Sequence, residues 1–249
     1  MKKKILSVLL VSALLFCSFA ALVSAEGNET VVCQTAADVM NYVIVSKENT
    51  VPVRIYPAEL EKGGESRSVY FISMLGVKGN MKQVNSAKNL GPAAFNKDNS
   101  YSEFVVETIV QNIPAGSALV FGCHSLGGMV AQHLRENKTL IENYEIVNVL
   151  TAGSPLILVK GETEGSLVRL CDKGDVIPLM SPATFLNLSA QIKSAERESG
   201  GYRFDPDGAH NLSYMRNDVW GAYDALGVKG GDAALRLYTA EVTFYGVVN

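Results

Sequence analysis

A short apolar run that passes directly into a glycine-rich turn and then a helix constrains this chain most. The run Ala118–Phe121 is typical of a strand buried in a parallel sheet. A stretch with helical character follows at once, from Leu126 to Asn137. A strand that leads straight into a helix is typical of α/β proteins with a mostly parallel central sheet flanked by helices. The turn between them reads Gly122-Cys123-His124-Ser125-Leu126-Gly127-Gly128.

The rest of the chain has the same alternation of strand and helix patterns. Further strands are expected at 51–56, 68–75, 146–150, 167–170 and 238–248, from their β-branched, aromatic or continuous apolar residues. Apolar residues at helical spacing predict helices at 35–44, 100–113 and 212–226. Residues 181–209 have no clear period and are expected to form a surface excursion near the site.

Capping residues place the ends of these helices. Ser100 and Glu103 have the spacing of a capping box, and Pro114 ends the helix that they begin. Thr35 is expected to cap the first helix, and Gly227 to close the last one.

The N-terminal segment has the pattern of a secretory signal peptide. Lys2-Lys3-Lys4 precedes an apolar run from Ile5 to Ala21, and Val23-Ser24-Ala25 has small residues where signal peptidase needs them. The sequence therefore predicts a signal peptide at 1–25 and a secreted, extracellular single domain at 26–249. A retained membrane anchor is the alternative, because the apolar run is long enough to span a bilayer.

Charge and cysteine content limit the partners, disulfides and cofactors that we expect for the chain. Its 249 residues have a formal net charge of −3 and a pI near 5.7, without a long basic run, so nucleic acid is not expected as a partner. Beyond the signal segment lie Cys33, Cys123 and Cys171, an odd number that allows at most one disulfide and leaves the pairing open. No metal-ligand spacing is present, and we expect neither a metal nor another cofactor.

Ser125 is the candidate nucleophile. A sharp strand-to-helix turn lifts a serine hydroxyl out of the sheet and exposes it to a base, and such a crowded turn needs small residues on both sides. Gly127 meets this requirement on one side, and Cys123 takes the place of the usual glycine on the other. The helix that starts at Leu126 aims its free N–H groups at the site.

A base and an orienting acid are expected to follow in the order Ser, Asp, His. His210 lies in a loop before a helix and is the candidate general base, whereas His124 within the turn is expected to be structural and to point away from Ser125, and His133 to serve packing or the surface. Asp172 and Asp175 both follow a buried strand, where catalytic groups gather in such sheets. Asp175 is favoured because the Asp-Val-Ile-Pro turn should present it rigidly.

Between about Ser68 and Tyr223 the chain resembles the fungal-type, or class 3, lipases and their bacterial relatives. The matching segments are His124-Ser125-Leu126-Gly127-Gly128, Ala152-Gly153-Ser154-Pro155, Asp175-Val176-Ile177-Pro178, and His210 with Tyr214. The resemblance implies an α/β-hydrolase fold with Ser125, Asp175 and His210 as its catalytic triad. It also implies that Ser154, in the family's Gly-x-Pro turn, is not a second nucleophile.

Two departures from the family concern the oxyanion hole and the nucleophile turn. Leu75-Gly76-Val77 stands where the lipases usually have Arg-Gly-Thr or Arg-Gly-Ser, and Cys123 stands where they usually have Gly. The oxyanion hole would then consist of the N–H groups of Leu126 and Val77, without a third donor from a side-chain hydroxyl. The lipase lid would correspond to Gly79–Asp98, for which an ordinary solvent loop is the alternative.

The resemblance implies a secreted serine hydrolase that cleaves carboxylic, including lipid, esters through an acyl-enzyme. The expected partners are a small-molecule or lipid ester substrate and a lipid interface. An acyltransferase that uses the same triad is one alternative, and a catalytically degenerate hydrolase fold used for binding is another. The triad does not encode which ester is cleaved.

Overall fold

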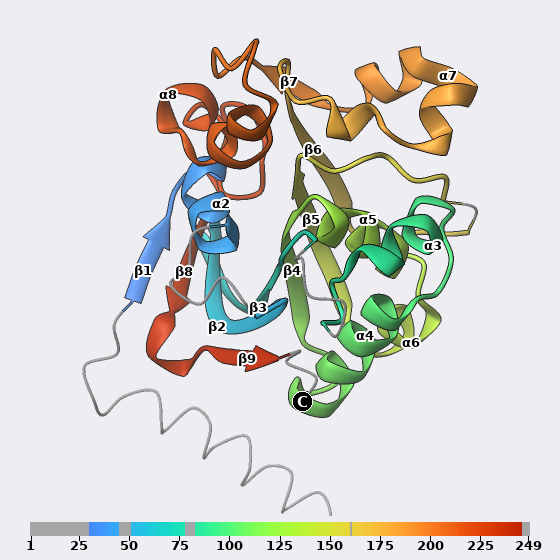
Figure 1. Ribbon diagram of the computed structural model, residues 1–249. Coiled ribbons are helices and arrows are strands. Elements are labelled where there is room, and N and C mark those ends of the chain that lie inside the picture. The colour runs from blue at the N-terminus through green and yellow to red at the C-terminus, as the bar shows by residue number, and fades with distance from the viewer. Residues whose placement is uncertain (1–29, 45–50, 78–82, 160, 246–249) are drawn as a thin grey trace, which may run out of the picture.

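A single mixed β-sheet forms the centre of the protein (Figure 1). The computed structural model describes residues 30–44, 51–77, 83–159 and 161–245. The nine-stranded sheet has the order β1-β8-β2-β3-β4-β5-β6-β7, and β9 pairs with β2 beside β8. Its strands are β1 (Thr30–Cys33), β2 (Val53–Lys62), β3 (Glu65–Met74), β4 (Ala118–His124), β5 (Glu145–Ala152), β6 (Ser166–Asp172), β7 (Glu196–Glu198), β8 (Ala234–Tyr238) and β9 (Thr243–Tyr245).

The direction of the strands confirms the expected mostly parallel α/β sheet. Each neighbouring pair from β3 to β7 is parallel, whereas β2 pairs antiparallel with β3, β8 and β9, and β1 pairs antiparallel with β8. Only β1 and β2 therefore run against the other described strands. β4 lies in the middle of the parallel part and is buried on both faces from Leu119 to His124, which explains its continuous apolar sequence.

Helices cover both faces of the sheet. On one face, α2 (Ala36–Ile44) and the segment from Tyr214 to Leu226 form one buried apolar cluster with the strands. On the other face, the apolar sides of α3 (Leu90–Ala94), α4 (Ser100–Asn112), α5 (Leu126–Leu134) and α6 (Lys138–Asn143) form a second cluster (Figure 1). The remaining helical segments are η1 (Ala87–Asn89), η2 (Ile177–Leu179), α7 (Pro182–Lys193), η3 (Gly208–Leu212), η4 (Ser213–Met215), α8 (Asn217–Trp220) and η5 (Thr239–Glu241).

The predicted continuous helix at 212–226 is wrong. The chain forms the π-helix η3, the 3₁₀-helix η4 and the short α8 in succession, followed by turns. Its largest buried side chains lie outside the expected helical spacing: the Trp220 ring contacts the rings of Tyr214 and Tyr223 over centroid distances of 5.7 and 5.5 Å. Leu212, expected on the apolar helix face, is 49% exposed. The aromatic contacts and the turns after Trp220 therefore override the apolar periodicity.

Residues 181–209, expected to form a surface excursion, contain α7 and the edge strand β7. The strand expected at 238–248 is divided, because β8 ends at Tyr238 and β9 covers Thr243–Tyr245 with the 3₁₀-helix η5 between them. Of the 79–98 segment, residues 87–94 are helical, and residues 79–82 lie outside the described residues.

The expected signal peptide or anchor at 1–25 also lies outside the described residues. Within the described ranges, none of the helices is both long enough and apolar enough to cross a membrane.

The N-terminus of α4 is capped by Asn99 rather than by the predicted Ser100–Glu103 box. The Asn99 side chain accepts hydrogen bonds from the N–H groups of Tyr101 (3.0 Å) and Ser102 (3.1 Å), and the Ser102 hydroxyl oxygen accepts one from the Asn99 N–H (2.9 Å). The capping box is thus present, but one residue earlier than the Ser-x-x-Glu pattern predicts.

Replacement of this cap should measurably destabilise the fold. Asn99→Ala is expected to lower the free energy of unfolding by about 1 kcal/mol, because two N–H groups of α4 lose their acceptor. Glu103→Gln, which removes the acid of the sequence-predicted box, should cost less than about 0.5 kcal/mol. Urea unfolding followed by circular dichroism measures both variants, and an equal or larger loss in Glu103→Gln would contradict the Asn99 cap.

Candidate active site

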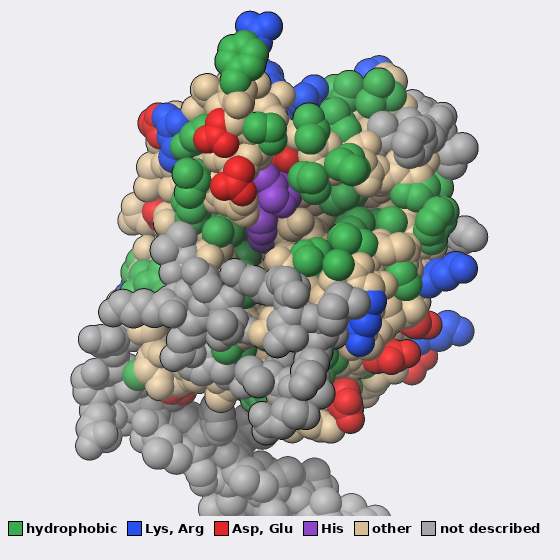
Figure 2. Space-filling model, in the orientation of Figure 1, with side chains coloured by type: hydrophobic (Ala, Val, Ile, Leu, Met, Phe, Trp, Pro, Cys, Tyr) green, Lys and Arg blue, Asp and Glu red, His purple; other side chains and the backbone are tan. Residues whose placement is uncertain are grey.

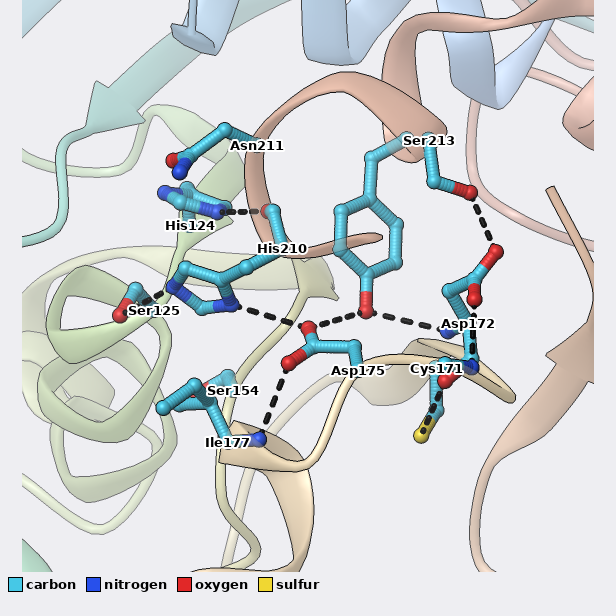
Figure 3. A network of polar contacts seen from close by, with 12 residues as sticks. His124, Ser125, Ser154, Cys171, Asp172, Asp175, Ile177, His210, Asn211 and Ser213 are labelled. Carbon is cyan, nitrogen blue, oxygen red and sulfur yellow. Dashed lines mark hydrogen bonds and ion pairs between the residues drawn. The ribbon is translucent and has the colours of Figure 1, made fainter. Parts of the chain in front are cut away.

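The candidate site lies where neighbouring parallel strands end. Gly76 follows β3, Ser125 follows β4, Gly153 follows β5, and Asp172 is the last residue of β6. The register of the parallel pairs brings these carboxyl ends to the same edge of the sheet. His210 comes from η3, far along the chain, and its side chain lies over this edge (Figure 3).

Ser125 occupies a strained turn between β4 and α5. Its φ of 53° and ψ of −121° lie in a region that residues other than glycine rarely adopt. The turn is tight because α5 starts directly against β3: a Cβ on Gly127 would lie 2.6 Å from the Met74 carbonyl oxygen. Glycine at 127 is therefore a steric requirement. The crowding that the small residues around Ser125 predicted is present in this turn.

The expected oxyanion residues lie beside this turn. Leu126 is the first residue of α5, so its N–H has no acceptor within the helix. The Leu75-Gly76-Val77 loop contacts the turn closely, since a Cβ on Gly76 would lie 2.8 Å from the Ser125 Cβ. The buried Asn85 side chain fixes this loop by donating a hydrogen bond to the Gly76 carbonyl oxygen (2.7 Å).

Ser125 and Asp175 each lie within hydrogen-bond distance of the His210 ring. His210 Nε2 lies 3.1 Å from Ser125 Oγ, and His210 Nδ1 lies 2.9 Å from Asp175 Oδ2 (Figure 3). The Asp175 side chain is 1% exposed and that of His210 16% exposed, so the acid is buried and the base lies between it and the surface. The structure thus brings together all three residues of the sequence-predicted triad.

Asp175 is held by donors on both oxygens. Its Oδ1 accepts from the Ile177 N–H (2.9 Å), and its Oδ2 accepts from the Tyr214 hydroxyl (2.7 Å) as well as from His210. Burial, followed by the nearby Asp175 carboxylate, raises the pKa of Tyr214 well above its usual value, so this phenol stays protonated and remains a donor. These bonds point one carboxylate oxygen at His210.

Asp172, the alternative acid, has a different set of partners. Its carboxylate accepts from the N–H groups of Gly174 and Gly200 (both 2.6 Å) and from the Ser213 hydroxyl (2.5 Å). Two of these donors lie in loops and the third at the start of η4, and none is the His210 ring. Asp172 therefore ties the segments around 200 and 213 to the end of β6, whereas Asp175 contacts the imidazole.

Gly153 allows the acid and the base to meet. It has a φ of +62°, and a Cβ there would lie 2.9 Å from His210 Nδ1 and 3.0 Å from Asp175 Oδ2. The next residue, Ser154, is 2% exposed and its hydroxyl packs beside Gly128 of α5. Gly153 of the Gly-x-Pro turn thus leaves the space in which His210 and Asp175 meet, and Ser154 of the same turn is buried.

The other two histidines have separate partners. His124 Nε2 lies 2.8 Å from the His210 carbonyl oxygen, and the ring is 5% exposed. His133 lies on α5 with its ring nitrogens 2.8 Å from Asn96 Oδ1 and 3.0 Å from Asp98 Oδ1. His133 therefore has the packing role expected from the sequence, and holds residues 96–98 against α5.

The three cysteines of the described chain are free and buried. Cys123 is fully buried in the turn strand, and burial raises the pKa of its thiol well above the usual value. Burial also raises the pKa of Cys171, and raises that of Cys33 to about 12. These thiols are protonated and inaccessible, which excludes a thiolate role in the site. The one disulfide that the count allowed is not formed among them.

Figure 2 shows an exposed histidine with hydrophobic side chains on one side and acidic side chains on the other. Val77, Val176 and Leu212 are 36%, 54% and 49% exposed, and each lies within two residues of a site residue in the chain. We call these three residues the apolar rim. Met180, after η2, is 64% exposed and adds to the exposed apolar surface that follows Asp175 in the chain.

Sequence reasoning missed several supports of the site. Neither the Asn85 bond to the oxyanion loop nor the His124 bond to His210 has a local signal, because the partners are 9 and 86 residues apart. Tyr214 entered only through the family resemblance, and it lies in the 3₁₀-helix η4, directly after the π-helical turn of η3. Within the described ranges, no group of His, Cys, Asp and Glu is arranged to hold a metal ion.

Comparisons with known proteins give no match to this chain: no family model, no curated protein and no solved structure matches it significantly.

The crowding at Gly153 gives a test of this geometry. Gly153→Ala should break the His210–Asp175 contact, and Gly201→Ala is its matched control, because Gly201 also has a positive φ (+83°) but open space around it. Both should lose about 1 kcal/mol of stability from the strained backbone. Only Gly153→Ala should lose the downfield proton NMR signal of the His210 Nδ1–H. Retention of that signal would contradict the described packing.

Proposed function

We propose that this protein is a secreted serine hydrolase of the α/β-hydrolase fold that cleaves carboxylic esters, similar to the class 3 lipases. One observation carries the proposal: a serine in the strained strand-to-helix turn lies within hydrogen-bond distance of a histidine, which lies within hydrogen-bond distance of a buried aspartate. Each contact of the Ser-His-Asp arrangement is present, on loops from three different places in the chain. The apolar and cleavable N-terminal pattern supports secretion.

In the proposed mechanism, His210 Nε2 accepts the proton of Ser125 as the serine oxygen attacks the ester carbonyl carbon. The protonated His210 then gives this proton to the leaving alcohol, and Ser125 remains acylated. Water next attacks the acyl carbon while His210 accepts its proton, and the acid leaves as the proton returns to Ser125. Asp175 keeps the Nδ1–H in place and stabilises the transient imidazolium.

The carbonyl oxygen becomes negatively charged as each attack proceeds. The Leu126 N–H at the start of α5 and the Val77 N–H of the neighbouring loop are the proposed donors to it. The contact between Gly76 and Ser125 keeps the loop at the nucleophile, and the Asn85 bond keeps the loop in shape. This arrangement needs no side-chain hydroxyl, which agrees with the absence of Thr or Ser after Gly76.

The apolar rim supports an ester with an apolar acyl group as the substrate. Val77, Val176 and Leu212 present hydrocarbon to solvent close in the chain to the site residues, and burial of that surface against an acyl chain is favourable by about 25 cal/mol for each Å². The same exposed side chains would contact a lipid surface if the ester lies in one. Residues of the rim do not distinguish the alcohol part of the ester.

A fluorophosphonate probe tests whether Ser125 is an activated nucleophile. The wild-type protein should be labelled on Ser125, and Ser125→Ala should take no label, because the reagent forms a bond only with a serine that a base activates. Ser154→Ala is the matched control and should keep the label. Mass spectrometry of the tryptic peptides locates the modified residue. An unlabelled wild-type protein would instead favour the degenerate hydrolase fold used for binding.

Kinetics on p-nitrophenyl esters separate the two candidate acids. Ser125→Ala and His210→Ala should each lower kcat by roughly 10⁶-fold, and Asp175→Asn by about 10⁴-fold, because the imidazole loses its proper tautomer. Asp172→Asn should destabilise the fold by about 1–3 kcal/mol through its unsatisfied donors, with kcat of the folded fraction within about tenfold. A greater loss of kcat in Asp172→Asn would reverse the assignment.

Ester products formed with added glycerol would indicate the acyltransferase alternative.

A further inference from the structure

The residue before the nucleophile contacts the residue that would act as its base. His124 is the last residue of β4, and its Nε2 donates a hydrogen bond to the main-chain carbonyl oxygen of His210 (2.8 Å, Figure 3). The two imidazole rings also face each other, with centroids 4.6 Å apart and an interplanar angle of 44°. Since His124 is 5% exposed, this contact is enclosed by protein.

The backbone around His210 is unusual. Residues Gly208–Leu212 form the π-helix η3, in which the Ser213 N–H donates to the Gly208 carbonyl oxygen five residues earlier. Single π-helical turns are rare and are often found at functional sites. The His124 bond connects this turn to the end of β4, at the main-chain carbonyl oxygen of His210.

The opposite edge of the His124 ring lies against the proposed oxyanion loop. A Cβ on Gly76 would lie 3.2 Å from His124 Nδ1 and 3.4 Å from the His124 carbonyl oxygen. One rigid side chain therefore touches both the main chain of His210 and the loop after β3. Because His124 adjoins Ser125 in sequence, the same short segment carries the nucleophile and sets the position of two other parts of the site.

We propose that His124 is a positioning residue that aligns the His210 imidazole with Asp175 and Ser125, an inference that rests on the proposed hydrolase function. It acts through its Nε2–H, which holds the His210 carbonyl, and it does not touch the reacting atoms. Among the described residues, Asp175 bonds to His210 Nδ1, and Tyr214, which bonds to Asp175, has its ring centroid 6.3 Å from that of His124.

Two substitutions separate the hydrogen bond from the space that the ring fills. His124→Phe keeps a ring of similar size but has no donor, whereas His124→Gln keeps an N–H donor at about the same distance from the backbone. We expect kcat to fall by roughly 10- to 100-fold in His124→Phe with KM little changed, because a small displacement of a catalytic group has effects of this size. His124→Gln should recover most of that loss.

The acid limb of the pH–rate profile distinguishes alignment from a general loss of folded protein. If His210 no longer faces Asp175, its imidazolium loses stabilisation, and the limb moves to lower pH in His124→Phe but not in His124→Gln. A merely structural defect lowers the active fraction, measured by fluorophosphonate labelling, without a change in the limb. Equal kcat and equal acid limbs in wild type and His124→Phe would overturn the inference.

A second measurement needs no turnover. The downfield proton NMR signal of the His210 Nδ1–H should be present in the wild-type protein and in His124→Gln, and weakened or lost in His124→Phe. An unchanged signal in His124→Phe would overturn the alignment role even if the protein proved not to be an esterase. A wild-type protein without esterase activity or label would refute the proposed function separately, so the two failures are distinguishable.

Discussion

The close approach of α5 to the carboxyl end of β3 is the constraint on which the site depends. Gly127 packs its Cα against the Met74 main chain, and this contact leaves Ser125 in a backbone conformation that is costly by itself. The neighbouring strand contributes in the same way, because Gly128 meets Ser154 without space for a side chain. The energy that offsets the strained turn comes from the buried apolar clusters on both faces of the sheet.

The parts of the structure that could be predicted are those with a local cause. The continuous apolar sequence of β4 and the helical pattern of α5 are contained in residues 118–134, and they predicted the turn between them. The position of Asp175 after β6 follows from the rule that functional side chains gather at the ends of parallel strands. His210 was chosen by elimination, and the structure places its ring beside Ser125 and Asp175, although the continuous helix expected after it is divided into short helical turns.

The parts that could not be predicted have causes distant in the sequence. The bonds of Tyr214 to Asp172 and Asp175, together with the contacts among the buried aromatic rings, set the path of the segment 208–226. These contacts override the regular apolar spacing that predicted a continuous helix. The cap of α4 was misplaced by one residue because Asn99 and Ser100 are both good capping residues. The strand β7 has only three residues, and its strand conformation depends on pairing with β6.

The buried, unbonded state of Cys33, Cys123 and Cys171 has a consequence for where this domain can fold. Since these residues form no cross-link, the described fold draws its stability from non-covalent contacts, and none of it from a disulfide among these three residues. Isolation of the thiols in the core also protects them from oxidants. Folding of the described domain therefore needs no oxidant to make a bond between these three thiols.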